Sequence, residues 1–312
     1  MISKTASISV VIPCYNAAAF LREAIDSALS QTRPADEIIV VDDASTDDSV
    51  EMALSYGDRI RLLRSPNAKG TGHGAAANRG IMASRGDYIA FLHADDIWVP
   101  QHLEKVAGLL DKWPEAVVAF SRMRCFGSSD SDFPFNPPEW DPPQDAFATI
   151  MRTTVVMPSC AVVRRTTAAE IGGFDEGRPF LADDFDFFVR CSLRGQFVNH
   201  PEQTVRYRVH DAQCSTSSDE TLLNGFRYRV RLLDELSLRP DMQERWSVGQ
   251  DRAQRRWEEW MEQAWRTRNL ARLKKLVRYG MGQPLYRAAT RPYVLKSRLP
   301  EWAVRLRDRW RG

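Results

Sequence analysis

The fold is decided by the stretch Glu37-Ile38-Ile39-Val40-Val41-Asp42-Asp43, an apolar run that ends in two aspartates. A continuous run of Ile and Val is typical of a strand that is covered on both faces, as in a parallel sheet. Comparable runs occupy residues 8–12, 60–63 and 88–92. We expect these runs to be strands, and we expect Pro13 to end the first because proline cannot donate a hydrogen bond within a central strand.

Helical patterns lie between these runs. After the first strand, apolar residues recur at helical spacing, namely Phe20, Leu21, Ala24, Ile25, Ala28 and Leu29. Strands that alternate with helices are joined by right-handed crossovers and lie parallel to one another. We therefore expect an α/β fold with a mainly parallel sheet flanked by helices.

The composition indicates an ordinary globular protein. With 312 residues, 43% of them hydrophobic, the chain can form one large domain with an appendage or two modest domains. The net charge of +2 argues against a dedicated nucleic-acid-binding protein. The cysteines are odd in number and widely spaced, which favours reduced, buried thiols in a cytosolic protein. No apolar run is long enough to span a bilayer and no signal peptide is seen, so we expect a cytoplasmic or peripheral protein.

Polar side chains directly follow three of the expected strands. In open α/β sheets, ligands bind beyond the carboxyl ends of the strands. Because these ends converge, we expect a carboxylate-rich site there. The residues concerned are Asn16, Asp42, Asp43, His93, Asp95 and Asp96.

Each of these aspartates also has a simpler interpretation as part of a helix start. Asp95 or Asp96 would cap a helix over residues 100–110, since Asp is a preferred N-cap residue. The aspartates after the second strand also precede a helix, although Ser45 or Thr46 fits that cap better. Taken singly, these residues do not distinguish a binding site from a cap.

A third pair of aspartates, Asp183 and Asp184, opens an amphipathic helix that ends by Gly195. This helix carries Phe187 and Phe188 on its apolar side. Acidic residues in a first turn interact favourably with the helix dipole, which is the alternative to a functional role.

Two segments of the middle region lack a helical period. Residues 133–143 contain five prolines, which predicts a loop over or beside the site. Residues 204–210 alternate between an apolar face and a polar face that carries Arg206, Arg208 and His210. A solvated strand face is the alternative interpretation of the two arginines.

From residue 219 onward the pattern is helical, and from Leu270 it is strongly cationic. Near the end, Trp302 and Trp310 interleave with arginines. Such a segment suits an anionic bilayer surface. Alternatively, it is a solvated helix that packs Trp302 and Leu306 onto the rest of the protein.

Taken in order, five segments resemble the motifs of the family 2 glycosyltransferases with the GT-A fold. The resemblance covers roughly residues 7–215. The segments are Val10-Val11-Ile12-Pro13-Cys14-Tyr15-Asn16, the stretch from Glu37 to Asp47, the run from Gly86 to Trp98 with the family's DxD position, Gly172-Gly173-Phe174-Asp175 followed by Asp183-Asp184-Phe185-Asp186, and Tyr207-Arg208-Val209-His210.

The resemblance implies a Rossmann-like GT-A catalytic domain over residues 1–218 and a helical, basic extension over residues 219–312. It implies an inverting, metal-dependent transferase that uses Mn²⁺ or Mg²⁺. The donor would be a nucleotide-diphosphate sugar, UDP-linked by resemblance, with GDP and dTDP still open. The acceptor would be a hydroxyl of a saccharide or polyprenyl-linked glycolipid in bacterial cell-surface polysaccharide assembly, with the enzyme cytoplasmic or peripheral at the inner membrane.

The resemblance also implies roles for individual residues. Donor-side residues would surround the base, ribose and phosphates, Asp95 would bind the metal with Asp96 beside it, and His210 would approach the diphosphate or metal. Asp184 would be the catalytic base, with Asp183 as its neighbour and the alternative base. The donor-binding set is Pro13, Tyr15, Asp42, Asp43, Asn78, Arg79, His93, Asp95, Arg208 and His210.

The chain departs from the family pattern at two positions. His93 stands where members commonly have Asp, and Ala77 stands where they often have Arg before the matching Asn78. The preceding loop is glycine-rich between Lys69 and Gly74. It would either bring backbone amides to a phosphate, with Lys69 or Arg79 supplying charge, or be a flexible surface loop.

Two other classes of function compete with an active transferase. A catalytically silent nucleotide-sugar-binding homologue is suggested by His93 and Ala77. The retained aspartates argue against it. A nucleotidyltransferase would be expected to carry a glycine-rich loop with Arg or Lys directly after the first strand, where this chain has Pro13-Cys14-Tyr15-Asn16.

Overall fold

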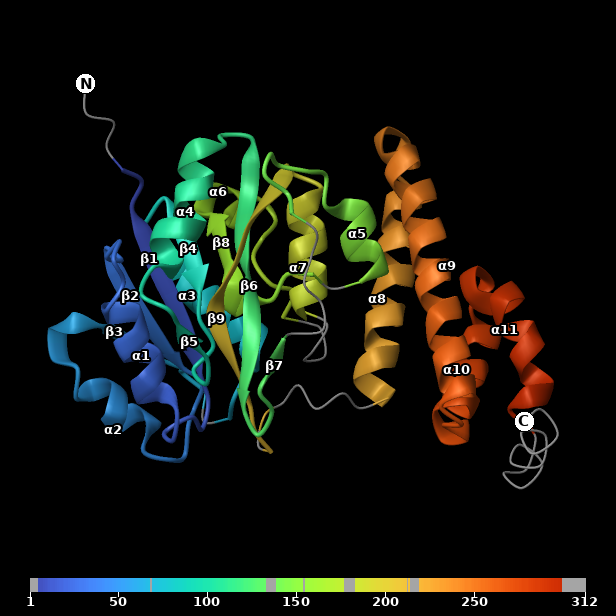
Figure 1. Ribbon diagram of the computed structural model, residues 1–312, viewed down its shortest axis with the longest axis horizontal. Helices are drawn as coiled ribbons and strands as arrows, with labels where there is room; N and C mark the ends of the chain where they lie inside the picture. The colour runs from blue at the N-terminus through green and yellow to red at the C-terminus, as the bar shows by residue number, and fades with distance from the viewer. Residues whose placement is uncertain are drawn as a thin grey trace. The chain divides into compact units, whose positions relative to one another are not determined.

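The computed structural model describes residues 5–67, 69–132, 139–153, 155–176, 183–211, 213 and 219–298 (Figure 1). The chain divides into two compact units. The first comprises residues 1–146 and 154–215, and the second comprises residues 147–153 and 216–312.

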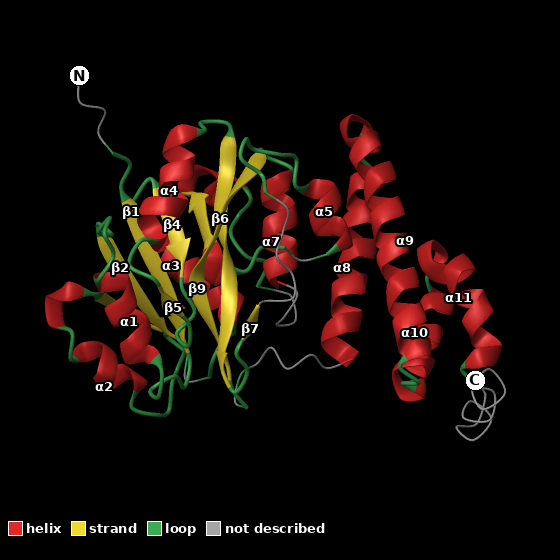
Figure 2. Ribbon diagram, viewed as in Figure 1, coloured by secondary structure: helices red, strands yellow, loops and turns green. Residues whose placement is uncertain are grey.

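The first unit is built on a mixed sheet with the strand order β3-β2-β1-β4-β8-β6-β9-β5, and β7 pairs with β6 (Figure 2). Strands β1 to β4 are parallel to their neighbours within that group, which confirms the parallel α/β prediction. The other part of the sheet is mixed, because β8 runs antiparallel to β4 and β6. The strands are β1 (Ile8–Cys14), β2 (Glu37–Asp42), β3 (Arg61–Arg64), β4 (Tyr88–Phe91), β5 (Ile97–Trp98), β6 (Ala116–Gly127), β7 (Ser131–Asp132), β8 (Ala161–Arg164) and β9 (Gln196–Val209).

Helices pack against this sheet at the places where the sequence is amphipathic. The helix α3 packs on β1 and β2, and α4 packs on β6, β8 and β9. The helices of this unit are α1 (Leu21–Leu29), α2 (Ser49–Leu54), α3 (His73–Ala83), α4 (His102–Lys112), α6 (Arg165–Glu170) and α7 (Asp183–Ser192), with short 3-10 turns η1 (Gly57–Arg59) and η2 (Pro158–Cys160).

Contrary to the expectation from the sequence, the first strand does not end at Pro13. It continues to Cys14, with Pro13 in register with Val41. The carbonyl of Val11 accepts a hydrogen bond from the chain after β4, whereas the carbonyl of Cys14 accepts one from Asp43 on the β2 side. Successive residues of β1 therefore face β4 and β2 in turn. Pro13 faces the β4 side, at a level where β4 has already ended.

The helix α3 lies so close to β1 that the contact requires glycine. A Cβ atom at Gly80 would lie 2.2 Å from Cγ1 of Val11, far inside van der Waals distance. This close approach sets the position of the whole helix. It therefore also sets the position of His73, the first residue of α3.

The second unit is helical, as the periodicity after residue 219 predicts. Its core includes Trp257, which stacks on Tyr286 at 4.7 Å between ring centroids and donates a hydrogen bond to Thr290. The buried Arg229 donates to the carbonyl of Met151. The helices are α5 (Phe147–Arg152), α8 (Asp219–Ser237), η3 (Pro240–Met242), α9 (Gln243–Arg266), α10 (Leu270–Gly282) and α11 (Pro284–Lys296).

Several sequence-based expectations concern residues that the structure describes only in part. The aromatic and arginine-rich segment with Trp302 and Trp310 lies outside the described residues, as do residues 133–138 of the proline-rich loop. Within the described residues, no helix combines the length and the apolar character needed to cross a bilayer. Cys14, Cys125, Cys160 and Cys191 are buried, as expected, and form no disulfide among the described residues, whereas Cys214 lies outside them.

Candidate active site

A cavity of about 530 Å³ opens beyond the carboxyl ends of β1, β2 and β4. Its walls combine residues from the strand ends, the glycine-rich loop, the start of α7 and the end of β9. This is the edge of the sheet at which the sequence predicts a ligand. The cavity is lined by Pro13, Cys14, Tyr15, Asn16, Ala17, Phe20, Asp43, Gly70, Gly72, His73, Ala76, His93, Ala94, Asp95, Met157, Asp183, Asp184, Tyr207, His210 and Gln213.

The glycine-rich loop is fixed to the end of β2 by one carboxylate. Asp43 accepts hydrogen bonds from the backbone N–H groups of Thr71 and Gly72, each at 2.7 Å. It also accepts from the Thr71 hydroxyl and from the guanidinium of Arg79, each at 2.6 Å. Burial alone would raise the pKa of Asp43, but these hydrogen bonds hold it below its ordinary value. The loop is thus tied to the cavity wall in the region that the structure describes.

A second carboxylate, Asp95, lies at the wall below the end of β9. Its Oδ2 atom is 3.1 Å from Nε2 of His210, and its side chain is 31% exposed. Arg208 donates from Nε to the Asp95 carbonyl and also pairs with Glu23 at 3.1 Å. Arg208 thus holds the backbone of Asp95 in place, and the Arg208 side chain is only 13% exposed. It therefore does not belong to a solvated strand face, which was the alternative interpretation from sequence.

The neighbouring carboxylate, Asp96, is buried beneath the wall. One of its oxygens accepts from the Ser159 hydroxyl at 2.6 Å and the other from the Arg208 backbone N–H at 3.0 Å. Burial and the nearby charge of Asp95 raise the pKa of Asp96 to about 8. Asp96 connects the turn after β4 with β9, whereas Asp95 points its carboxylate into the cavity.

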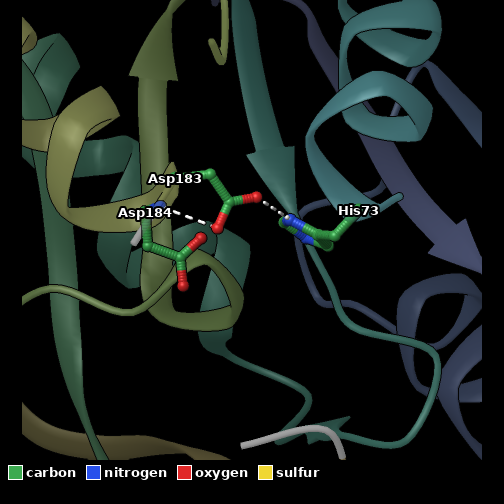
Figure 3. Close-up of side chains that lie close together, drawn as sticks. All are labelled: His73, Asp183 and Asp184. Atoms are coloured by element: carbon green, nitrogen blue, oxygen red, sulfur yellow. Dashed lines mark hydrogen bonds and ion pairs between the residues drawn. The ribbon is translucent and has the colours of Figure 1, made fainter. Parts of the chain in front are cut away.

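The first turn of α7 brings the third pair of aspartates to the cavity (Figure 3). The Asp183 carboxylate accepts from the backbone N–H of Asp184 and lies 3.1 Å from Nδ1 of His73. Burial opposes ionisation of Asp183, but its hydrogen bond with His73 lowers its pKa. Burial and the charge of Asp183 raise the pKa of Asp184 to about 7. Among the described residues, the buried Oδ1 atom of Asp184 has no hydrogen-bond partner.

Two histidines join the two sides of the site. Nε2 of His73 lies 3.1 Å from Nε2 of His93, and the rings meet edge to face. Burial opposes protonation of His73, but Asp183 raises its pKa. Burial and the charge of His73 lower the pKa of His93 to about 4. A continuous polar chain therefore runs from Asp183 through both imidazoles.

The predicted site residues fall into two groups. Pro13, Tyr15, Asp43, His93, Asp95, Asp183, Asp184 and His210 line the cavity together. The other predicted residues, Asp42, Asn78, Arg79, Asp96 and Arg208, are not part of the described lining. The side-chain amide of Asn78 holds the backbone of Phe174: its Nδ2 donates to the Phe174 carbonyl, and its Oδ1 accepts from the Phe174 N–H. Asp42 accepts from the N–H of Ser45, within the turn after β2.

The paired aspartates after β2 and β4 are not the N-caps of the helices that follow them. The N-cap of α4 is Gln101, so neither Asp95 nor Asp96 caps that helix. The N-cap of α2 is Asp48, which excludes both the paired aspartates after β2 and the preferred alternatives, Ser45 and Thr46.

His73, Ser159 and Gln213 are site residues that sequence reasoning did not assign. His73 was visible only as one residue of a glycine-rich loop, and Ser159 precedes β8 with no motif around it. A histidine at the first position of a helix that follows such a loop was the available signal for His73. Ser159 and Gln213 carried none.

The site contains donors that fit a divalent metal. His93, Asp95 and Asp96 each offer a ligand atom, and these atoms lie within 4.8 Å of one another. Carboxylate and imidazole are common ligands of divalent ions. Because both oxygens of Asp96 already accept hydrogen bonds, Asp95 is the carboxylate of this pair that is able to bind directly.

Comparisons with known proteins agree with this geometry. Residues 9–172 match the family described as glycosyl transferase family 2. An uncharacterized glycosyltransferase of Rickettsia typhi is 31% identical over 235 residues, covering 70% of this chain and 71% of that protein. The O-antigen biosynthesis protein RfbC of Myxococcus xanthus is 30% identical over 240 residues, covering 75% of this chain but only 18% of that protein.

A solved structure is similar in fold. Residues 1–349 of TarS from S. aureus, in complex with UDP-GlcNAc, give a TM-score of 0.65 at 18% identity over 81% of this chain and 72% of that chain. At this identity the likeness shows a shared GT-A architecture and nothing about substrate. The sequence match covers more than half of the chain, and it includes the strand ends that form the cavity. The chain therefore belongs to glycosyl transferase family 2.

Proposed function

We propose that the protein transfers a sugar from a UDP-linked donor to an acceptor hydroxyl, with inversion, during assembly of a bacterial cell-surface polysaccharide or glycolipid. One observation carries the proposal. The same cavity contains Asp95, a candidate metal ligand, and the pair Asp183 and Asp184, of which Asp184 is suited to accept a proton. A metal-assisted glycosyl transfer uses both kinds of group.

The donor class is supported by the comparisons. TarS, whose fold is similar, has been solved with UDP-GlcNAc, and the relative from M. xanthus is named for O-antigen biosynthesis. In this chain, Tyr15 is 57% exposed at the cavity, where its ring is available to a nucleotide base. Asp43 shapes the same wall by holding the glycine-rich loop in place.

We infer that Asp95 and His210 hold a divalent metal, Mn²⁺ or Mg²⁺, at the diphosphate. Asp95 Oδ2 and His210 Nε2 are 3.1 Å apart, so both atoms are able to approach one ion. When bound, such a metal neutralises the charge that develops on the departing diphosphate. Arg208 keeps Asp95 in place through the Asp95 carbonyl.

Asp184 serves as the general base in this proposal. Its pKa of about 7 allows it to take the acceptor proton near neutral pH, and its side chain lines the cavity. The acceptor oxygen then forms a bond to the anomeric carbon as the bond from that carbon to the diphosphate oxygen breaks. A single in-line attack of this kind inverts the anomeric centre. Asp183 keeps Asp184 in position through the hydrogen bond to its backbone N–H.

We also propose that the acceptor is a saccharide or a polyprenyl-linked glycolipid, reached from the cytoplasmic face of the inner membrane. The helices α10 and α11 carry Lys and Arg but no Asp or Glu. Arg272 and Lys275 share the single carboxylate of Asp219, so these helices keep a net positive charge that would attract anionic lipid. Flotation of the purified protein with anionic liposomes, but not with neutral ones, would support this placement.

Calorimetric titration tests the donor site. We expect UDP to bind more tightly than GDP or dTDP when Mn²⁺ is present, and the binding to weaken strongly in EDTA. Asp95→Asn should remove the metal effect but leave residual nucleotide binding. Binding of UDP without transfer to any hydroxyl acceptor would favour a catalytically silent homologue. If no nucleotide binds with or without metal, the donor-site proposal is wrong.

A further inference from the structure

Two imidazoles face each other inside the cavity, and neither is part of the pair formed by Asp95 and His210. His73 comes from the first residue of α3 and His93 from the turn after β4. Their Nε2 atoms are 3.1 Å apart. The side chains are 13% and 23% exposed, so both are largely enclosed but open to the cavity.

The partners of the other ring nitrogens determine where the protons lie. Nδ1 of His73 is 3.1 Å from the Asp183 carboxylate, which holds a proton at Nδ1 when the ring is neutral. The lone pair of Nε2 then points toward His93. Nδ1 of His93 lies 4.0 Å from the Asp96 carboxylate. His73 has the usual arrangement of a metal-binding histidine, in which the nitrogen away from the ion meets a carboxylate. The 4.0 Å separation at His93 is too long for a hydrogen bond.

We propose that His73 and His93 bind a divalent transition metal through their Nε2 atoms, with Asp95 as an oxygen ligand, and that the site selects this class of metal over Mg²⁺. The inference rests on the proposed function, because the ion would lie at the donor diphosphate. It extends the ligand pair proposed above, Asp95 and His210, by two imidazole nitrogens.

The distances fit this assignment. Two nitrogens bound tetrahedrally to one ion, at typical metal–nitrogen distances, lie about 3.3 Å apart. The two Nε2 atoms are 3.1 Å apart, which is close to that spacing. Asp95 is nearby, because its ligand atom lies within 4.8 Å of one ring nitrogen of His93.

The ligand chemistry determines the choice of metal. Imidazole suits ions such as Co²⁺ and Zn²⁺, whereas Mg²⁺ favours oxygen ligands in an octahedral arrangement and keeps several of its waters. A carboxylate at position 93 would favour Mg²⁺ more than the histidine found here. Because His73 meets Asp183 through Nδ1, it is able to bind a metal through Nε2 without losing that contact.

Titration of the full-length, EDTA-treated protein with Co²⁺, followed by visible absorption, tests the proposal without any measurement of activity. We expect Co²⁺ bands with nitrogen ligation, and a Co²⁺ affinity at least about tenfold higher than the Mg²⁺ affinity measured by competition. His73→Gln and His93→Gln should each weaken Co²⁺ binding by at least about tenfold. His200→Gln, at a half-buried position of β9 outside the cavity lining, is the matched control and should leave it unchanged. Circular dichroism establishes that each variant is folded.

A gain of function makes the test sharper. His93→Asp should shift the preference toward Mg²⁺, lowering the ratio of Co²⁺ to Mg²⁺ affinity by about tenfold or more. Equal affinities for Co²⁺ and Mg²⁺ in the natural protein, or unchanged Co²⁺ binding in both glutamine variants, would overturn the inference.

Parallel titrations with UDP separate this result from the proposed function. Metal-dependent UDP binding that persists in His73→Gln with unchanged Co²⁺ affinity rejects the histidine ligands but keeps the donor site. Conversely, a Co²⁺ site that depends on both histidines in a protein that binds no nucleotide confirms the ligands and rejects the donor site.

Discussion

The Arg79 guanidinium donates a hydrogen bond of 2.6 Å to the Asp43 carboxylate, joining α3 to the end of β2. Arg79 also donates to the Thr71 hydroxyl, which itself donates to Asp43. The glycine-rich loop therefore has a defined anchor. It is not a loosely held surface loop, which was one of the two interpretations from sequence.

Removal of this anchor should weaken donor binding. We expect Arg79→Met to raise the Kd of UDP about tenfold, because a charge-assisted hydrogen bond contributes about 1.5–3 kcal/mol and part of that would be lost from the loop. Arg64→Met is the control, since the Arg64 side chain is 65% exposed and its ion pair with Asp42 is long, at 3.9 Å. Calorimetry measures both. Equal effects of the two substitutions would show that general surface charge, and not the anchor, governs binding.

Loss of the proposed base should reduce turnover but not nucleotide binding. We expect Asp184→Asn to lower kcat by about 10²–10⁴ while the Kd of UDP stays within a factor of two or so. The carboxamide keeps the shape of the side chain but cannot accept the acceptor proton. Asp48→Asn, at the exposed N-cap of α2, serves as the control. Full activity of Asp184→Asn would transfer the base role to Asp183.

A buried histidine of α4 that does not line the cavity, His102, should make the stability pH-dependent. Burial lowers the pKa of His102 to about 3, against an ordinary value of 6.5. Below about pH 6.5 the unfolded chain therefore binds a proton at His102 that the folded protein does not bind. The contribution of His102 to stability is fully present above that pH and is lost as the pH falls. The loss should be about 2 kcal/mol between pH 6.5 and about 5.

Urea denaturation of His102→Gln measures this contribution. The variant should have a smaller slope of unfolding free energy against pH in that window, whatever its stability at pH 7.5. The half-buried His200 keeps some access to water, so His200→Gln should change the slope less. An unchanged slope in His102→Gln would show that other groups control the acid sensitivity.

The close approach of α3 to β1 should be visible in stability. Gly80→Ala places a methyl group 2.2 Å from Val11 Cγ1, and overpacking of this kind costs about 1–3 kcal/mol. Gly108→Ala is the matched control within α4, because nothing lies within 4 Å of its added Cβ. We expect that control to raise stability by about 0.5–1 kcal/mol, since alanine favours helix. Thermal unfolding distinguishes the two directions.

The parallel core could be predicted because each of its strands is a short, contiguous run of apolar residues. Runs such as residues 38–41 are too apolar to lie at a surface, and their spacing leaves room for the crossover helices. The end of β1 was misjudged for a reason that is not local. Whether Pro13 disturbs the sheet depends on where β4 stops, and β4 is more than seventy residues away.

Part of the cavity lining could be predicted from the sequence, but the contacts within it could not. The sequence places Asp95 and Asp96 together, yet only the packing of Ser159 and Arg208 shows that one of them is buried and occupied. The contact between His73 and Asp183 spans 110 residues. No pattern along the chain predicts such a pair, because it depends on how closely α3 approaches the sheet.

The hydrogen bond from Arg208 to Asp96 bridges 112 residues, and this has a consequence for the protein during its synthesis. A nascent chain that has emerged only as far as residue 172 contains all of the segment that matches the family, including Asp95, but not β9. The turn after β4 then lacks the contacts from Arg208 and His210 that hold it in place. The growing polypeptide should therefore gain the ability to capture its donor late and in one step, when β9 joins the sheet.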